Sequence, residues 1–249
     1  MEGKLWYLKR CDLFEQLTPE QVHRLESRAL MRKFKRHATV YAPSEPGLSV
    51  LVLATGRVKI KHLTPDGKET ILAFIEEGEI FGELALLGDN LRGEHAEAVE
   101  DSQILLIPQE DLLWLMEQRS DLALSITKLV GLRRRRIENR LRNVLFLSSR
   151  ERMVHMLLEL IDSYGDRQGN VCTIRLPLTH QDLASLIGVT RETVTVVLGQ
   201  LQYDRLIKVQ RRHITVLDCE RLAQECGQAA KFFSERGPHL EAIPKYREL

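Results

Sequence analysis

Hydrophobic residues between positions 178 and 203 recur at helical spacing in two short runs. They are Leu183, Leu186 and Ile187 in the first run, and Val194, Val197, Leu198 and Leu201 in the second. Thr179 and Thr190 stand where the two runs begin and are good N-caps, and Gly188 ends the first run. The pattern predicts two short helices joined by a tight turn, a helix-turn-helix, although an ordinary helical hairpin would show it too.

The second of these helices would turn Arg191, Glu192 and Thr195 toward solvent. An arginine can make a bidentate contact to guanine, and a glutamate can accept a hydrogen bond from cytosine N4. These residue types favour a helix that lies in the major groove of DNA over a helix with a merely solvated charged face.

A different pattern fills residues 39–107, where short apolar runs alternate with Gly, Pro and Asp. The runs are 49–56, 57–63, 69–75 and 102–108, and Pro65-Asp66-Gly67 marks a hairpin turn between two of them. Strands this short and evenly spaced predict a small antiparallel barrel or jelly roll. Residues 12–37, before the barrel, are predicted to be helical, with a capped start at Thr18-Pro19-Glu20.

A long helical pattern runs from about Pro108 to Phe146, with a break near Asp121. Its apolar positions are Ile126, Val130, Ile137, Leu141 and Val144, a spacing that fits the seam of a coiled coil. The run from Arg133 to Arg136 interrupts the stripe, and four successive residues cannot all point outward, because each turns about 100° around the helix. We expect a parallel dimer seam here; the alternative is a helix packed on its own barrel.

The C-terminal third begins with an amphipathic helix over 150–163 and a turn-rich loop over 164–170. After the helix-turn-helix, residues 206–218 read as two short strands with Arg211 and Arg212 near their turn. This order of elements predicts a winged helix, followed by a tail with a helical start at Cys219.

Composition narrows the class of protein. The 249 residues carry a net charge of +1, and residues 179–216 hold five Lys/Arg against three Asp/Glu, so any DNA-binding charge must be arranged on one face. There is no apolar run near the ~18 residues of a membrane span and no apolar signal core at the N-terminus, so we expect a cytoplasmic protein with no membrane partner. The cysteines Cys11, Cys172, Cys219 and Cys226 lack metal-ligand spacing and are expected to be reduced thiols, with no metal site.

Catalysis has no support in the sequence, because no nucleophile–base pair, Walker motif or HExxH is visible. We therefore expect no enzyme. The alternative of another class is a ligand-binding protein without DNA activity, which would leave the charged helix and the basic strands after it unexplained.

Three stretches together resemble the CRP/FNR superfamily of bacterial transcription regulators, over about residues 12–217. They are residues 52–87, which include Gly82-Glu83-Leu84, the long helix 122–146, and residues 178–201. The resemblance implies an α+β fold: an effector-sensing jelly-roll β-barrel at 1–118, a dimerisation helix at 119–147, a winged helix-turn-helix at 148–218 and an extension at 219–249. It also implies a homodimer on a palindromic operator in double-stranded DNA, with RNA polymerase as a further partner.

The DNA-reading positions match the cyclic-AMP receptor branch well. There, the positions of Arg191 and Glu192 contact a G and a C of the half-site, and those of Thr179 and Gln181 contact phosphates. Thr195 is a further candidate for base contact, and Lys208, Arg211 and Arg212 are expected to hold phosphates. Val196 departs from the branch, which has a third base-reading arginine at that position.

The effector positions match less well. In members that bind cyclic AMP, the glutamate of Gly82-Glu83-Leu84 takes the ribose hydroxyl, and an Arg-Ser or Arg-Thr pair holds the phosphate; here that pair is Arg92-Gly93. The adenine-binding Thr-Ser pair of the long helix falls on Ile137 and Glu138, which disfavours cyclic AMP. An iron–sulfur cluster of the FNR type is not expected, because only Cys11 lies near the N-terminus.

Three further possibilities for the barrel stay open. Haem would use His37, His62 or His95. A different anionic molecule would be held by Arg92 and an arginine of the 133–136 run. The third possibility is that the protein has no effector, so that its abundance alone controls it.

Overall fold

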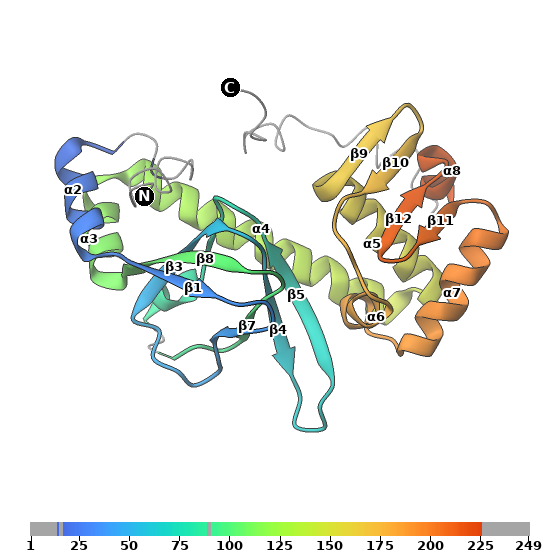
Figure 1. Cartoon of the computed structure of the whole chain (residues 1–249), viewed down its shortest axis with the longest axis horizontal. Coiled ribbons are helices and arrows are strands. Elements are labelled where there is room, and N and C mark those ends of the chain that lie inside the picture. The colour runs from blue at the N-terminus through green and yellow to red at the C-terminus, as the bar shows by residue number, and fades with distance from the viewer. Residues whose placement is uncertain (1–13, 15–16, 89–90, 226–249) are drawn as a thin grey trace. The chain divides into compact units, whose positions relative to one another are not determined.

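The computed structural model describes residue 14, residues 17–88 and residues 91–225. Contacts divide the chain into two compact units, with the boundary between Ile137 and Glu138. Figure 1 labels the helices and strands of both units. The boundary falls inside a long helix, so each unit contains one part of it.

The first unit begins with α2 (Pro19–Arg28). The hydroxyl of its N-cap Thr18 accepts a hydrogen bond from the backbone amide of Gln21, and the side-chain oxygen of Gln21 accepts one from the backbone amide of Thr18. The expectation of a helix over 12–37 is wrong beyond Arg28. Residues Leu30–Phe34 form strand β1 instead, paired antiparallel with β8. This distant pairing overrides the local helical pattern, since strand formation depends on a partner far away in the sequence.

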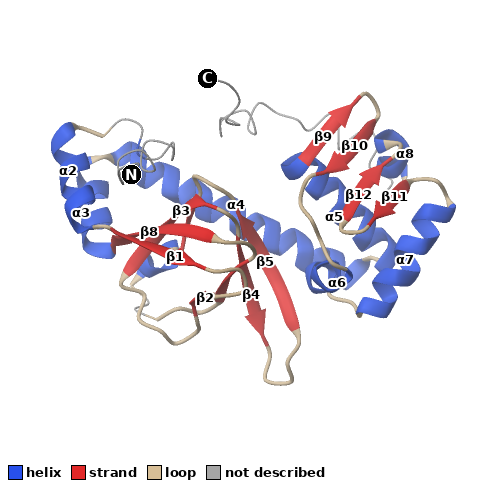
Figure 2. Cartoon of the chain, in the orientation of Figure 1, coloured by secondary structure: helices blue, strands red, loops and turns tan. Residues whose placement is uncertain are grey.

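Eight strands in the described part of this unit form two four-stranded sheets, drawn in red in Figure 2. The sheet orders are β1-β8-β3-β6 and β2-β7-β4-β5. The strands after β1 are β2 (Thr39–Tyr41), β3 (Ser49–Thr55), β4 (Val58–Leu63), β5 (Glu69–Ile75), β6 (Ile80–Phe81), β7 (His95–Ala98) and β8 (Ser102–Pro108). The predicted antiparallel jelly roll is confirmed, and four of its strands coincide with the four apolar runs.

The β4–β5 hairpin closes at the predicted Pro-Asp-Gly turn. The amide of Gly67 donates to the carbonyl of Thr64 over 2.9 Å, and Gly67 has φ +82°, a left-handed conformation that glycine adopts without strain. The hairpin brings Val58, Ile60 and Ile75 into the core between the sheets, where they pack with Phe81 and Ile104.

Two helices follow the sheets: α3 (Gln109–Gln118) and α4 (Ser120–Phe146). The break between them lies at Arg119, close to the predicted position. Asp111 of α3 is fully buried and forms ion pairs with Arg24 and Arg28 of α2, which tie the two helices together. Ile126 of α4 is buried in the core of the first unit with Leu122 and Leu115.

The second unit contains α5 (Ser149–Tyr164), α6 (His180–Ile187), α7 (Arg191–Tyr203) and α8 (Cys219–Gln224) around a small sheet. The sheet has the order β11-β12-β10-β9, formed by β9 (Gly165–Gln168), β10 (Val171–Ile174), β11 (Ile207–Gln210) and β12 (His213–Val216). The loop predicted over 164–170 is therefore wrong: most of it is strand β9, which pairs with β10 and turns at Gly169.

The last turns of α4 are fastened to α5 within this unit. Arg152 of α5 donates to the carbonyls of Leu147 and Val144, each over 2.9 Å, and Arg140 pairs with Glu159 at 2.9 Å. The two bonds from Arg152 satisfy carbonyls that a helix C-terminus leaves without an intrahelical partner.

Candidate nucleic-acid interface and effector region

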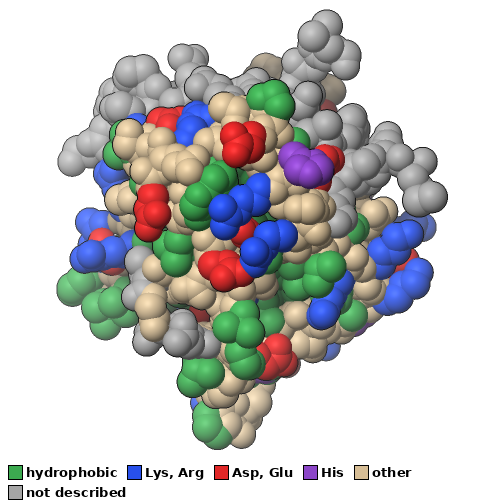
Figure 3. Space-filling model, turned by 90° about the vertical axis from the view of Figure 1, so that its left-hand side faces the viewer, with side chains coloured by type: hydrophobic (Ala, Val, Ile, Leu, Met, Phe, Trp, Pro, Cys, Tyr) green, Lys and Arg blue, Asp and Glu red, His purple; other side chains and the backbone are tan. Residues whose placement is uncertain are grey.

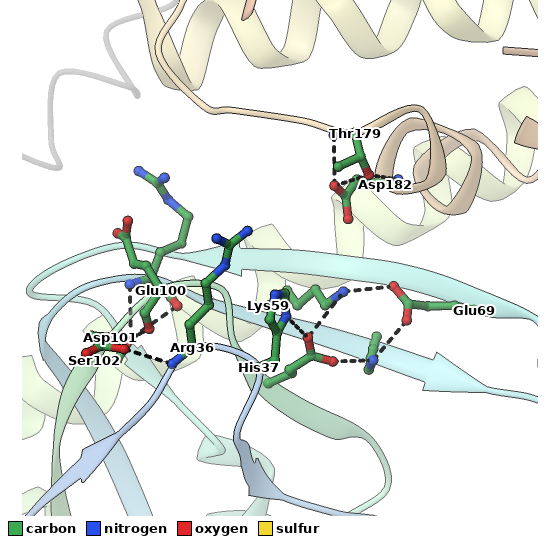
Figure 4. Close-up of polar contacts among 12 residues, drawn as sticks. Arg36, His37, Lys59, Glu69, Glu100, Asp101, Ser102, Thr179 and Asp182 are labelled. Carbon is green, nitrogen blue, oxygen red and sulfur yellow. Dashed lines mark hydrogen bonds and ion pairs between the residues drawn. The ribbon is translucent and has the colours of Figure 1, made fainter. Parts of the chain in front are cut away.

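The helix-turn-helix begins with a capping box at Thr179. Its hydroxyl accepts a hydrogen bond from the amide of Asp182, and the Asp182 carboxylate accepts hydrogen bonds from the Thr179 amide and hydroxyl, as Figure 4 shows. Gly188 ends α6 at φ +68°, where L side chains are strained, and Thr190 caps α7 through the amide of Thr193. Threonine and glycine thus stand where the tight turn between α6 and α7 requires them.

Helix α7 has the two faces that its sequence predicts. Val194, Val197, Leu198 and Leu201 are buried, whereas Arg191, Glu192 and Thr195 are exposed. Backbone and Thr190 hydroxyl hydrogen bonds lower the pKa of Glu192 below its ordinary value, with a smaller contribution from Arg191. Glu192 is therefore a carboxylate at neutral pH and can act only as a hydrogen-bond acceptor.

The hydroxyl of Thr195 is engaged inside the unit. It donates to the carbonyl of Arg191 over 3.1 Å and lies 2.9 Å from Nδ1 of His180 at the start of α6. His180 thus links the two helices of the motif, a role that the sequence alone did not indicate. Val196, the residue after Thr195, is 60% exposed. A β-carbon on Gly199 would meet nothing within 4 Å.

The wing is the hairpin of β11 and β12. Its turn includes Arg211 at φ +55°, and the carbonyl of Arg212 accepts from the amide of Leu178, just before α6. Lys208, Arg211 and Arg212 are all exposed. The amide of Val209 donates to Gln202 of α7 over 3.0 Å, so the wing is fixed to the helix-turn-helix.

Gln181 completes the predicted DNA-binding residues. It is exposed on the first turn of α6, and its amide nitrogen lies 3.5 Å from the hydroxyl of Ser185. The second unit therefore contains every DNA-binding residue expected from the sequence, with charged groups exposed on α7 and on the wing.

In the first unit, the Gly82-Glu83-Leu84 motif begins the short helix η2 (Glu83–Leu87). Gly82 has φ +68°, and a β-carbon there would lie 2.5 Å from the Arg92 guanidinium. That guanidinium is buried, donates to the carbonyl of Gly82 over 2.8 Å and to that of Ser49, and lies over the ring of Tyr41. Arg92 therefore lies beside the motif, as expected, but its donors are directed at backbone carbonyls.

Glu83 is buried and has a partner on α4. Its Oε2 accepts from Arg133 over 2.6 Å, and the same guanidinium donates to the carbonyl of Ile80 over 2.6 Å. Arg133 is thus the member of the arginine run that points inward, which helical geometry required of at least one of the four. Leu84 and Gly93 are exposed, and Gly93 has open space beside it.

Residues of the expected seam on α4 have unequal exposure. Ile137, Leu141 and Val144 are 45%, 58% and 41% exposed, and Val130 is partly exposed. Ile126 is only 5% exposed, because it packs into the core of its own unit, so we remove it from the seam.

The histidines named for a haem lie on or near the sheet surface. His62 is exposed, and Nδ1 of His37 lies 3.2 Å from Glu97. Glu97 also forms ion pairs with Lys59 and Lys61, and Lys61 pairs in turn with Glu69. This network spans β4, β5 and β7, and part of it is labelled in Figure 4. Among the described residues, no group of three His, Cys, Asp or Glu side chains has the arrangement of a metal site.

Two cysteines lie together in the core of the second unit. Cys172 of β10 and Cys219 of α8 are buried free thiols, and burial raises the pKa of both, that of Cys219 to about 11 with a contribution from Cys172. Both are therefore protonated and unreactive at neutral pH. Cys11 and Cys226 lie outside the described residues.

Surface charge is mixed on the face of the molecule shown in Figure 3. Lys and Arg side chains there alternate with Asp, Glu and hydrophobic side chains, and the described residues in view form no large patch of one sign. None of the helices in the described ranges combines the length and apolar character that a membrane crossing requires.

Two family models match the chain. Residues 31–119 match the cyclic nucleotide-binding domain, and residues 151–225 match the Crp-like helix-turn-helix domain. The first match covers the two sheets, and the second covers α5 to α8.

Similar proteins include a global nitrogen regulator of Synechococcus elongatus, 31% identical over 78% of this chain and 89% of that protein. A cyclic AMP receptor protein of Thermus thermophilus is 30% identical over 81% of this chain and 90% of that protein. A solved structure of a CooA mutant from Carboxydothermus hydrogenoformans shares the fold, with a TM-score of 0.74, 19% identity and coverage of 91% of this chain and 97% of that one. The chain therefore belongs to the CRP/FNR family of transcription regulators and carries the family's helix-turn-helix DNA-binding domain.

Proposed function

We propose that the chain acts as a homodimer that binds a two-fold symmetric DNA site and reads each half-site with Arg191 and Glu192. The observation that carries this proposal is the pair of exposed, unlike charges on the first turn of α7, directly after the cap at Thr190. A guanidinium and a carboxylate in this place match a G and a C edge in the major groove. Thr179, Gln181, Lys208, Arg211 and Arg212 would surround them as phosphate contacts.

The seam of the proposed dimer is the exposed apolar stripe of Val130, Ile137, Leu141 and Val144 on α4. The last three of these side chains are each more than one third exposed, and they recur at intervals of four and three residues. A parallel pair of α4 helices would cover them by coiled-coil packing. Two symmetry-related copies of α7 would then enter successive major grooves about 34 Å apart.

We further propose that the effector is a molecule other than cyclic AMP or that none is needed. Support comes from the Arg92 guanidinium, whose donors face Gly82 and Ser49, and from Glu83, which is paired with Arg133. A cyclic nucleotide would have to displace both arrangements. Gly93 also offers no hydroxyl to a phosphate, and Ile137 offers no hydrogen bond to adenine.

The test of DNA reading is a gel shift against a randomised palindromic library at fixed salt. We expect selection of one site, with Arg191→Ala weakening the specific complex by about 1–3 kcal/mol and relaxing one base pair per half-site. Arg221→Ala on α8, another exposed arginine, serves as the matched control and should leave selectivity unchanged. Unchanged selectivity in Arg191→Ala, or a protein that binds no duplex, would contradict the proposal; the second result would favour a ligand-binding protein.

Calorimetry with cyclic AMP tests the effector proposal. We expect no saturable binding and no change in DNA affinity when the nucleotide is added. Saturable binding that is lost in Arg92→Ala would show that this site takes a cyclic nucleotide after all.

Because chromosomal DNA lies in the bacterial cytoplasm, a protein that binds it would act there. At promoters it would contact RNA polymerase. A supershift of the operator complex by purified polymerase tests this contact. No supershift with any promoter that contains the selected site would remove polymerase from the list of partners.

A further inference from the structure

The exposed face of α7 changes from charged to apolar side chains one turn after Arg191 and Glu192. Residues four apart lie on the same face of a helix, so Thr195 follows Arg191, and Val196 follows Glu192. Val196 is 60% exposed, whereas Val194 and Val197 beside it are buried in the core of the unit. Val196 therefore does not serve the packing of its own unit.

Thr195 offers little polar chemistry to a ligand. Its hydroxyl already donates to the carbonyl of Arg191 and contacts Nδ1 of His180, both within 3.1 Å. Engaging a base edge with that hydroxyl would break a bond that joins α6 to α7. What remains of Thr195 for a partner is its methyl group.

Gly199 bounds the apolar step on the other side. It lies three residues after Val196 on the same face, and a β-carbon there would meet nothing within 4 Å. Gln200, four residues after Val196, is the next exposed polar side chain on this face and lies beside Val196 and Gly199. The face carries, in order, a guanidinium and a carboxylate, then two apolar groups, then the open backbone of Gly199 and the side-chain amide of Gln200.

Of the base edges in the major groove, only thymine presents an apolar group, its C5-methyl. We propose that Val196 packs against a thymine C5-methyl and makes the protein select thymine at that position of the half-site. One helical turn advances 5.4 Å along α7, and B-DNA rises 3.4 Å per base pair, so this thymine lies one or two base pairs from the pair read by Glu192. This inference rests on the proposed function, since it needs α7 to lie in the groove.

The test removes the methyl group and nothing else. Each thymine of the selected site is replaced in turn by deoxyuridine, and binding to wild-type protein is measured. At one thymine per half-site, one or two base pairs from the pair that Glu192 reads, we expect affinity to fall about threefold to tenfold, the value of one buried methyl group. Replacing the same thymine by cytosine or by 5-methylcytosine should show the same ratio in favour of the methylated base.

Variants assign this methyl effect to one side chain. In Val196→Ala, thymine and deoxyuridine at that position should bind equally well. Thr195→Ser keeps the hydroxyl and removes the neighbouring methyl group, so it should retain the discrimination. If Thr195→Ser loses it and Val196→Ala keeps it, Val196 is not the reader.

Other outcomes separate this inference from the function on which it rests. If Arg191→Ala relaxes its own base pair but no thymine in the site is sensitive to deoxyuridine, the inference fails and the proposed function stands. A sensitive thymine outside the two allowed positions also overturns the inference. If the wild-type protein selects no site, both fall together.

Discussion

The guanidinium of Arg133 lies 2.6 Å from the carboxylate of Glu83, and this ion pair joins α4 to the first residue of η2. Glu83 is 7% exposed and Arg133 is 19% exposed, so water screens the pair only weakly. The resemblance to the CRP/FNR family implies that this glutamate accepts a hydrogen bond from a hydroxyl group of the ligand. In this chain an arginine of the same unit already occupies it.

Breaking this ion pair should destabilise the first unit. Arg133→Ala leaves a buried carboxylate without its counter-ion, and we expect the free energy of unfolding to fall by about 2–4 kcal/mol in urea titrations. Arg135→Ala, at an exposed position of the same helix, should change it by less than about 0.5 kcal/mol. Adding Glu83→Gln to Arg133→Ala should recover part of the loss, because the amide carries no charge to leave unpaired; an additive double variant would argue against a coupled pair.

Charge placed in the proposed seam should separate the protomers. Ile137→Arg or Leu141→Arg would bury a guanidinium between two α4 helices, and we expect sedimentation to show at least about a tenfold weaker dimer. Leu124→Arg is the control, since Leu124 is also exposed on α4 but lies about 120° around the helix from Val130. A dimer that resists both seam substitutions would place the interface elsewhere.

Acid should weaken the second unit through His155. Burial lowers the pKa of His155 below 6.5, and Glu151 one turn earlier opposes this only in part. A group whose folded pKa is depressed adds stability above its unfolded pKa, and that stability is lost as the pH falls below about 6.5. His155→Gln should therefore flatten the decline of the free energy of unfolding between pH 7 and pH 5. His213→Gln, at the exposed first residue of β12, is the control and should leave the decline as it is in the wild type. Parallel declines in wild type and His155→Gln would show that other groups cause it.

Two glycines should respond to alanine in opposite directions. At Gly165 a β-carbon would lie 2.3 Å from the carbonyl of Ile161 and 2.5 Å from the sulfur of Cys172, so Gly165→Ala forces the backbone to shift. We expect a loss of about 2–4 kcal/mol in the free energy of unfolding. Gly199 is open in the middle of α7, and Gly199→Ala should raise stability by about 0.5–1 kcal/mol. Equal effects at the two positions would contradict this packing at the end of α5.

The features that could be predicted from the sequence are those with local causes. The β4–β5 hairpin follows from its turn residues, and the two faces of α7 follow from its apolar spacing. Strands β1 and β9 escaped prediction, because each is defined by pairing, β1 with a strand about 70 residues away and β9 with a neighbour after a short turn. Their own residues do not alternate in hydrophobicity.

The candidate sites divide in the same way. Exposure of Arg191 and Glu192 follows from helical periodicity alone. The partners of Arg92 and Arg133, by contrast, include backbone carbonyls of Gly82, Ser49 and Ile80 that lie 10 to 53 residues away, and no sequence pattern marks them. Burial of Ile126 could not be predicted for the same reason: the stripe identifies apolar positions but does not say which of them its own domain covers.

The bonds from Arg152 to the end of α4 have a mechanical consequence. Because the carbonyls of Val144 and Leu147 accept hydrogen bonds from Arg152 of α5, we expect the final turns of α4 to move together with the helix-turn-helix. If two such helices pair, a small rotation of one about the other would rotate each helix-turn-helix by the same angle. An effector that changes how the two α4 helices pair would then change the distance between the two α7 helices on the DNA.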